Sequence, residues 1–326
     1  MKRRQLLIAL GAGALSAPFA TFAQPRKVWR IGYLGRSDES FHLPWLNAFK
    51  AGMSALGYVE GRDYAIELRL ARSDIARLPA LAAELVALKV DLILTSGTPT
   101  VAAASKASRE IPILLTTAGD PVGSGFAASF ARPGGQITGL TGLTSELVSK
   151  RLDLLRQLLP RMQRVGFLYD PNNQSDVLGL KQFESDCEKI RLQPIPAAAR
   201  KAEDMTGAFE TLARHKAQAL TVVNSSVNNV SRKRIIAQAT KSRLPSISGS
   251  IAWAENGTLM AYGPDPADMY RRAAGYADKI FKGAKPGDLP IELPVKFEFA
   301  INLKTAKAIG IRIPQPVLVQ ATRVIE

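Results

Sequence analysis

The stretch Arg30–Leu34 (RIGYL) returns almost unchanged as Arg164–Leu168 (RVGFL), and each copy opens a similar succession of short apolar runs. A second correspondence follows in the same order and at nearly the same spacing, between Lys89–Ile93 and Lys216–Leu220. Ordered matches of this kind predict one α/β lobe used twice. Two such lobes leave a cleft between them, and clefts between domains are where small-ligand sites preferentially form.

Apolar runs alternate with segments of helical periodicity through both halves. Residues 28–34 are typical of a buried parallel strand, and apolar residues then recur at helical spacing from Trp45 until Gly57 supplies a stop. This βα order predicts parallel sheets with helices on both faces. We expect further strands at 64–70, 90–95, 113–117, 165–169, 219–223 and 246–249, and helices at 78–88, from Pro99 onward, and at 176–190, 204–215, 230–242 and 269–281.

The 326 residues exceed what one hydrophobic core usually supports. We predict an N-terminal α/β lobe over 28–145, completed by part of 270–326, and a C-terminal α/β lobe over 146–269. The helix at 269–281 and the segment from Ile301 onward are expected to cross back towards the first lobe.

The first 23 residues have the composition of a cleavable export signal. Lys2-Arg3-Arg4 precedes a Gly- and Ala-rich apolar run, and Thr21-Phe22-Ala23 offers small residues at the usual cleavage spacing. A membrane anchor needs about 20 apolar residues, whereas this run is short and is broken by Pro18. We therefore expect residues 1–23 to be removed on export to the periplasm, with the Arg3-Arg4 pair leaving the twin-arginine route as an option.

Composition argues against several classes of partner. Cys187 is the only cysteine, which excludes an internal disulfide and a cluster of sulfur ligands for a metal, and we expect it to be a buried helix residue. The formal net charge is +15, but the basic residues are scattered and no basic run is interleaved with stacking aromatics. The charge thus indicates a solvated basic surface, or attraction to an anionic membrane face or acidic partner, and no nucleic-acid partner.

Enzyme motifs are weak in this chain. Gly123–Ala128 matches the G-x-G-x-x-A dinucleotide pattern, yet Asp120-Pro121 intervenes after the expected strand, and the first strand-to-helix turn at Gly35 lacks the motif. The two histidines, His42 and His215, have no paired-ligand spacing. We predict no catalytic residue, metal site or cofactor, and keep an exported cofactor-dependent enzyme, such as an oxidoreductase, as the alternative.

The loops after the expected strands are rich in small, hydroxyl and amide side chains. Ligands of open parallel sheets sit at the carboxyl ends of strands, where such loops lie, although Gly, Ser, Asn and Pro are also ordinary loop residues. Recurrence of this composition after successive strands of both halves favours a binding site. The loops are 35–41, 96–98, 118–121, 170–173, 224–226 and 248–250.

Three groups of strings carry a family resemblance. They are Gly57–Arg62 (GYVEGR), Gly119–Gly123 (GDPVG) with Ala131–Gly135 (ARPGG), and the tail from Leu289 to Ala306. The chain resembles the ABC transporter substrate-binding family, whose better-known members bind tryptophan or tyrosine. That resemblance implies the type I periplasmic binding protein fold: two Rossmann-like lobes with parallel sheets flanked by helices, hinge crossovers, and a small polar ligand, such as an aromatic or branched amino acid, between the lobes. It also implies delivery to the permease and ATPase subunits of an importer, with membrane contact through the permease only.

The resemblance also implies which residues contact the ligand. For an amino acid, Ser96, Gly97 and Thr98 precede a helix and suit the carboxylate. Asp120 suits the ammonium, or else caps a turn beside Pro121. The full predicted set adds further loop residues and apolar walls, and comprises Tyr33, Ser96, Gly97, Thr98, Asp120, Asn173, Asn224, Trp253 and Tyr262.

Overall fold

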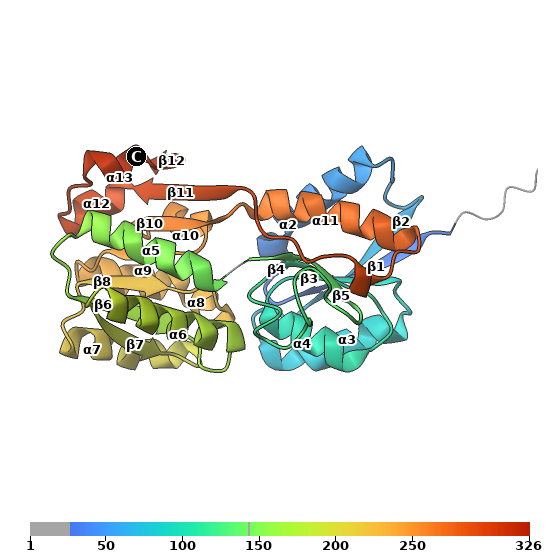
Figure 1. The fold of residues 1–326 in the computed structure, drawn as a ribbon, viewed down its shortest axis with the longest axis horizontal. Helices are drawn as coiled ribbons and strands as arrows, with labels where there is room; N and C mark the ends of the chain where they lie inside the picture. Colours follow the sequence, from blue (N-terminus) through green and yellow to red (C-terminus); the bar gives the residue numbers. More distant parts are fainter. Residues whose placement is uncertain (1–26, 143) are drawn as a thin grey trace, which may run out of the picture.

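The computed structural model describes residues 27–142 and 144–326, so the expected export signal, 1–23, lies outside the described residues. The described strands form two separate sheets, one in each of the two lobes seen side by side in Figure 1. The first sheet is parallel throughout, in the order β2-β1-β3-β4-β5. Its strands are β1 Trp29–Gly35, β2 Tyr64–Leu70, β3 Leu92–Thr95, β4 Ile113–Ala118 and β5 Ile137–Thr141.

The second sheet has the order β12-β11-β10-β9-β8-β6-β7. Its neighbours run parallel except β10 and β11, which are antiparallel. Its strands are β6 Arg164–Tyr169, β7 Gln193–Ala198, β8 Ala219–Val222, β9 Ser246–Ser248, β10 Met260–Pro264, β11 Phe297–Asn302 and β12 Arg323–Ile325.

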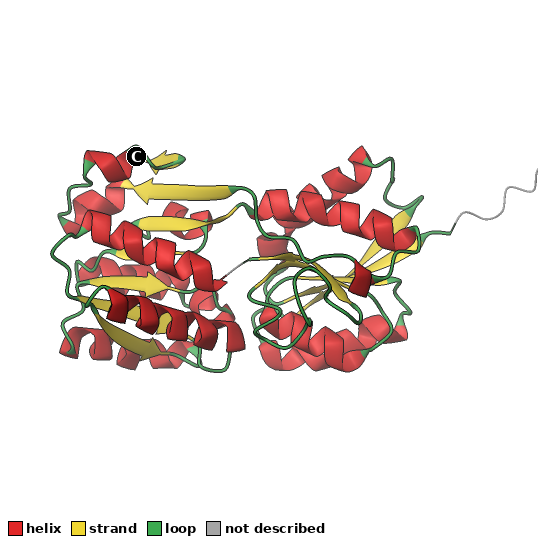
Figure 2. Cartoon of the chain, viewed as in Figure 1, coloured by secondary structure: helices red, strands yellow, loops and turns green. Residues whose placement is uncertain are grey.

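Helices cover both faces of each sheet, as Figure 2 shows with helices in red and strands in yellow. In the first lobe α2 Glu39–Ala55 and α11 Pro266–Phe281 cover one face, and α3 Leu78–Ala87 and α4 Thr98–Ala107 the other. In the second lobe α5 Thr144–Leu158 and α6 Gln174–Lys189 lie opposite α7 Met205–Arg214 and α9 Arg232–Lys241. Shorter helices are α8 Ser226–Val230, α10 Ile251–Glu255, α12 Leu303–Ile309 and α13 Gln315–Leu318, with 3-10 turns at Ile75–Arg77, Ala202–Asp204 and Pro286–Asp288.

Burial explains the apolar runs that mark the strands. β3 (LILT) and β8 (ALTV) are buried along their whole length, because helices on both faces leave no strand face for water. Each sheet therefore has a core above and below it. The two-lobed α/β architecture expected from the repeated RIGYL and RVGFL strings is confirmed, and those strings become β1 and β6.

The chain passes between the lobes after β5, between β10 and α11, and between Pro286–Asp288 and β11. Helix α11 packs on α2 of the first lobe, as expected for 269–281. The expectation for Ile301 onward was wrong, because Ile301 belongs to β11, which pairs with β10 inside the second sheet. The second sheet thus includes 297–302 and 323–325, outside the 146–269 range expected for that lobe.

Several elements were not anticipated. Strand β7 (QPIPAA) contains two prolines, which a central strand would not accommodate, but it lies at the edge of its sheet, where a missing N–H is tolerated. The helix expected at 230–242 is α9, and the short helix α8 that precedes it, over Ser226–Val230, was not expected. Cys187 is buried on α6, as predicted, and burial raises the pKa of its thiol to about 12. Within the described part of the chain, we find no helix with both the length and the apolarity needed to span a bilayer.

A candidate ligand cleft between the lobes

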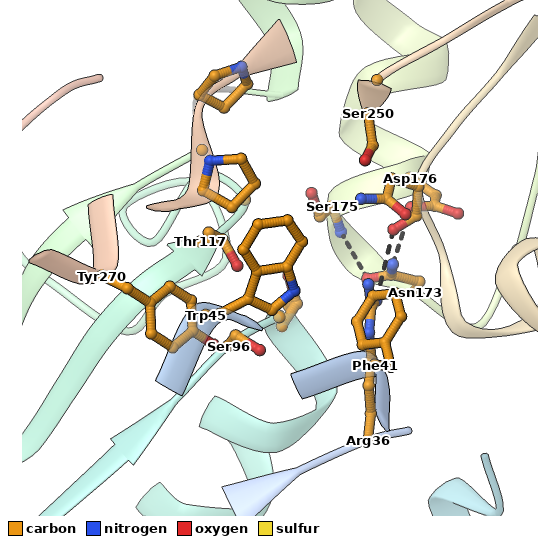
Figure 3. A pocket seen from close by; sticks show the side chains of 18 of the residues that line it. Arg36, Phe41, Trp45, Ser96, Thr117, Asn173, Ser175, Asp176, Ser250 and Tyr270 are labelled. Carbon is orange, nitrogen blue, oxygen red and sulfur yellow. Dashed lines mark hydrogen bonds between the residues drawn. The ribbon is translucent and has the colours of Figure 1, made fainter. Parts of the chain in front are cut away.

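A cavity of about 120 Å³ lies where the two lobes meet (Figure 3). Both lobes and two of the crossovers contribute to its wall. Its lining residues are Arg36, Phe41, Trp45, Ser96, Gly97, Thr98, Thr117, Gly119, Gly142, Arg151, Asn173, Ser175, Asp176, Asn224, Gly249, Ser250, Pro264, Pro266 and Tyr270.

Most of these positions follow directly from the sheet topology. Arg36 comes immediately after β1 and residues 96–98 come after β3, while Asn173 follows β6 and Asn224 follows β8. The carboxyl ends of parallel strands meet at one edge of each sheet, and these two edges face each other across the cavity. The cavity is therefore formed by the loops that a binding site in this type of fold uses.

Three charged side chains line the cavity, all nearly inaccessible to solvent. Arg36 of the first lobe is 8% exposed, and Asp176 and Arg151 of the second are 3% and 4% exposed. Desolvation lowers the pKa of Arg36, against the attraction of Asp176. It also raises the pKa of Asp176 to about 7. Among the described residues no ion pair within 4.0 Å joins Arg36 to Asp176, so both charges remain available to a ligand.

Asp176 is held in place by the start of α6. Its Oδ2 accepts a hydrogen bond from the Asp170 backbone N–H at 2.9 Å, and its Oδ1 accepts one from Asn173 Nδ2 at 2.8 Å. Asn173 is the N-cap of the helix and its Oδ1 accepts from the Ser175 N–H. This mutual arrangement resembles a capping box, which fixes a helix entry and here also aims a carboxylate.

Arg36 reaches across the cleft to the second lobe. Its Nη1 donates to the Asn224 carbonyl oxygen at 3.4 Å, while Nε is buried and has no hydrogen-bond partner in the described structure. A buried guanidinium N–H without a partner is unfavourable unless something else accepts it. Arg36 can therefore donate a hydrogen bond from Nε to an acceptor on a ligand.

A chain of buried hydrogen bonds stands behind Tyr270. The Ser37 backbone N–H donates to His42 Nε2 at 3.1 Å, so Nδ1 of a neutral imidazole must carry the ring proton. Burial supports that neutral form, because it lowers the pKa of His42 to about 3. His42 Nδ1 then donates to Tyr33 Oη at 2.8 Å, and Tyr33 donates to Tyr270 Oη at 2.9 Å. The remaining hydroxyl proton of Tyr270, which lines the cavity, is left for a ligand.

Helix α4 adds further donors. It starts at Thr98 after Gly97, whose φ of 89° lies in the left-handed region that favours glycine. Both residues line the cavity, so the N-terminus of this ten-residue helix points its unpaired N–H groups at the site. The half-buried rings of Phe41 and Trp45 on α2 supply an apolar part of the lining.

Of the sequence-predicted residues, the structure brings five together along the cavity: Ser96, Gly97, Thr98, Asn173 and Asn224. Tyr33 lies one layer behind, where it bonds Tyr270.

The other three lie elsewhere. Asp120 Oδ1 accepts from the Gly123 N–H at 2.8 Å, which is the turn-capping arrangement. Trp253 is buried in the second lobe and donates from Nε1 to Asn229 Oδ1. The ring of Tyr262 stacks on Phe297, away from the cavity lining.

Sequence reasoning missed all three charged residues and the α2 aromatics. Arg36 lies inside the 35–41 loop that was singled out, directly after a strand, and Asp176 lies three residues after an N-capping Asn. Those spacings were usable signals, whereas nothing local marks Arg151, in the middle of α5. The dinucleotide reading of 123–128 has no structural support, because these residues form turns and no helix begins there.

A family model described as ABC transporter substrate binding protein matches residues 44–325. The chain belongs to this family. The role of that family is solute binding for ABC transporters and is not catalytic, which removes the enzyme alternative. Substrate-binding proteins of ABC importers are exported and act in the periplasm or outside the cell.

Individual relatives agree with the family. A tyrosine-binding protein of Clostridioides difficile is 25% identical over 78% of this chain and 73% of its own length. A conserved domain protein from Vibrio cholerae is 24% identical with a TM-score of 0.86, covering 91% of this chain and all of the other. An ABC domain from Streptococcus pneumoniae in complex with L-Trp is 23% identical with a TM-score of 0.85, covering 92% of this chain and 100% of that chain. The fold is that of the type I periplasmic binding proteins.

Proposed function

We propose that this protein binds an amino acid, with an aromatic side chain as the leading class, between its lobes and delivers it to the permease and ATPase of an ABC importer. Residues 1–23 act as its cleavable export signal, with the twin-arginine route as one possible path. The observation that supports an amino acid as the ligand is the pair Arg36 and Asp176. The two side chains have opposite charges, are buried on opposite lobes of one cavity, and do not form an ion pair with each other.

An α-amino acid matches that pair because it carries both charges on one carbon. Its carboxylate would take the free donors of the first lobe: Arg36, the N-terminus of α4 and the Tyr270 hydroxyl. Its ammonium would lie against Asp176, whose ionised form it would stabilise. The side chain would rest on Phe41 and Trp45, in keeping with relatives that bind tyrosine or L-Trp.

Closure follows from the same contacts. A ligand that touches both lobes binds the closed arrangement more tightly than the open one and shifts the hinge equilibrium towards it. Arg36 and Asp176 reach the ligand together only when the lobes are near each other, so ligand charge is coupled to closure. No chemical step is required of the protein.

Isothermal titration with L-tyrosine and L-tryptophan tests the proposal. Each is compared with its amine (tyramine, tryptamine) and with its deaminated acid, which remove one charge at a time. We expect each truncated compound to bind at least about tenfold more weakly, since a buried charged partner is then left unpaired. Equal affinity for an amino acid and its two truncated forms would contradict the proposal.

A matched pair of variants separates the site from general charge effects. Arg36→Gln should remove the preference for the carboxylate, whereas Arg132→Gln, at an exposed arginine of the same lobe, should leave titrations unchanged. The thermal unfolding midpoint of both variants shows whether each is folded.

A further inference from the structure

Arg151 is a second buried guanidinium in the cleft, and a zwitterion leaves it without a counter-charge. It lies on α5, the first helix after the crossover from β5, and it lines the cavity while only 4% exposed. The hydrogen bond that the structure gives it runs from Nε to the Tyr262 carbonyl oxygen at 2.8 Å. No described acidic group forms an ion pair with it.

The surrounding backbone is shaped to admit this side chain. A Cβ at Gly249 would lie 2.7 Å from Arg151 Nη2 and 3.1 Å from Cζ, so any larger residue there would require the guanidinium to shift. The bond from Nε to Tyr262 fixes the plane of the group, and the Nη edge then lies beside Gly249, itself a lining residue. Two separate features thus hold a cation at this wall of the cavity.

Arg151 stays charged in this position. Desolvation lowers the pKa of its guanidinium to about 10, against a smaller charge interaction with the Tyr262 side chain, so the group remains protonated at neutral pH. Burying a charge without a partner is strongly unfavourable, and such groups in binding sites are stabilised by the ligand. The described charges of the lining are Arg36, Arg151 and Asp176, which leave a positive excess even when Asp176 is fully ionised.

We infer that the cognate solute carries a second anionic group, bound by Arg151, and is therefore an amino acid with net negative charge. This inference rests on the proposed function, because it assigns the α-carboxylate and ammonium to Arg36 and Asp176 and adds a third contact. The planar guanidinium of Arg151 presents a fork of N–H donors to this second anionic group, and that geometry suits a carboxylate.

Matched probes that differ only in that group test the inference by titration. The pairs are L-glutamate with L-glutamine, and 4-carboxy-L-phenylalanine with 4-carbamoyl-L-phenylalanine, with glutarate as an anion that lacks the amino group. In the wild-type protein the acid of at least one pair should bind about tenfold more tightly than its amide. In Arg151→Gln that ratio should fall close to one.

Two further variants guard against a purely structural effect. Gly249→Ala displaces the guanidinium without removing its charge and should also reduce the ratio. Arg151→Lys keeps the charge but not the fork, and should restore part of the preference. A loss of stability alone would lower both members of a pair together and leave their ratio as it was.

The outcomes separate this inference from the proposed function. Binding of L-tyrosine or L-tryptophan with no preference for the acids, or an acid-to-amide ratio that survives in Arg151→Gln, would overturn the inference and leave the amino-acid function standing. Binding of glutarate that depends on Arg151, with no amino acid bound, would overturn the function and support the anionic site. No binding of any of these probes would overturn both.

Discussion

Asp176 is an acid held at a position where its charged form is disfavoured. Desolvation raises its folded-state pKa from the ordinary 3.8 to about 7. Between these values the folded protein binds more protons at this site than the unfolded chain does, so the contribution of Asp176 to stability falls as pH rises through that window. Without ligand, the ionised carboxylate destabilises the closed cleft at neutral pH and above.

We therefore expect Asp176→Asn to flatten the pH dependence of stability. From about pH 4 to about pH 7.5 the free energy of unfolding of the ligand-free wild type should fall, relative to the variant, by up to about 4 kcal/mol. Urea denaturation at both pH values measures this difference. Two proteins whose curves run parallel with pH would show that Asp176 titrates normally in the folded state. Asp153→Asn, at an exposed acid of the neighbouring α5, serves as control.

Trp45 offers a direct optical signal of ligand binding. It is the tryptophan that lines the cavity, whereas Trp253 is buried in the second-lobe core and Trp29 stacks on Phe281 far along the first lobe. A ligand that packs on the indole changes its solvation and should shift or quench its emission. The signal should persist in Trp29→Phe and disappear in Trp45→Phe, with affinity lowered about threefold to thirtyfold by the smaller ring contact. A ligand-induced change that survives in Trp45→Phe would place the ligand away from α2.

At the residue scale, what the sequence could supply was loop chemistry. Ser96, Gly97 and Thr98 could be found because a strand ends just before them and Pro99 opens a helix just after. Arg36 also follows a strand directly, but its burial, like that of Arg151, could not be predicted, because a charged residue in a sequence is expected at the surface. Trp253 and Tyr262 were predicted to form aromatic walls of the site, but the side chain of each contacts residues of the second lobe instead.

The contact between α2 and α11 decides whether the crossover helix can complete the first lobe. Gly52 of α2 faces the backbone of α11 so closely that a Cβ would lie 2.5 Å from the Arg271 carbonyl oxygen and 2.8 Å from Ala274 Cβ. Backbone atoms cannot move aside as a flexible side chain can. The missing side chain at Gly52 is therefore what lets the two helices approach.

Gly52→Ala should accordingly destabilise the protein, by about 1–3 kcal/mol, because it overpacks a helix contact. Gly275→Ala is the matched control on α11, where a Cβ would meet nothing within 4 Å. There the change should stabilise by about 0.5–1 kcal/mol through helix propensity alone. Chemical denaturation of the two variants gives the comparison, and equal effects of the same sign would refute the proposed close approach.

Strands within the repeated halves were predictable at the element scale because burial on both faces leaves continuous apolar runs. The strands β10, β11 and β12 could not be predicted in this way. Strand β10 precedes helix α11 in the chain and β11 and β12 follow it, yet all three pair in one sheet. No local pattern at 297–302 says which lobe its strand will enter. That choice depends on which sheet edge is open, and the open edge of β10, where β11 pairs, is a property of the folded lobe.

At the scale of the whole molecule, the lobes touch outside the ligand cavity as well as around it. Leu178 of α6 packs against Gly123 of the first lobe, so closely that a Cβ at Gly123 would lie 3.1 Å from Leu178 Cδ1. This contact joins the two lobes at residues that are not part of the cavity lining. Its removal should change the hinge equilibrium alone, and the apparent affinity of a ligand falls with the population of the binding-competent state.

Leu178→Asp should thus weaken binding of a solute by about threefold to thirtyfold although no cavity residue has changed. In solution scattering, the ligand-free variant should have a larger radius of gyration than the wild type, and saturating ligand should bring the two values together. Lys181→Asp, one turn along α6 at an exposed position, introduces the same side chain away from the lobe contact and should match the wild type in both measurements. If Leu178→Asp bound with wild-type affinity and an unchanged radius of gyration, closure would have to depend on the ligand contacts alone.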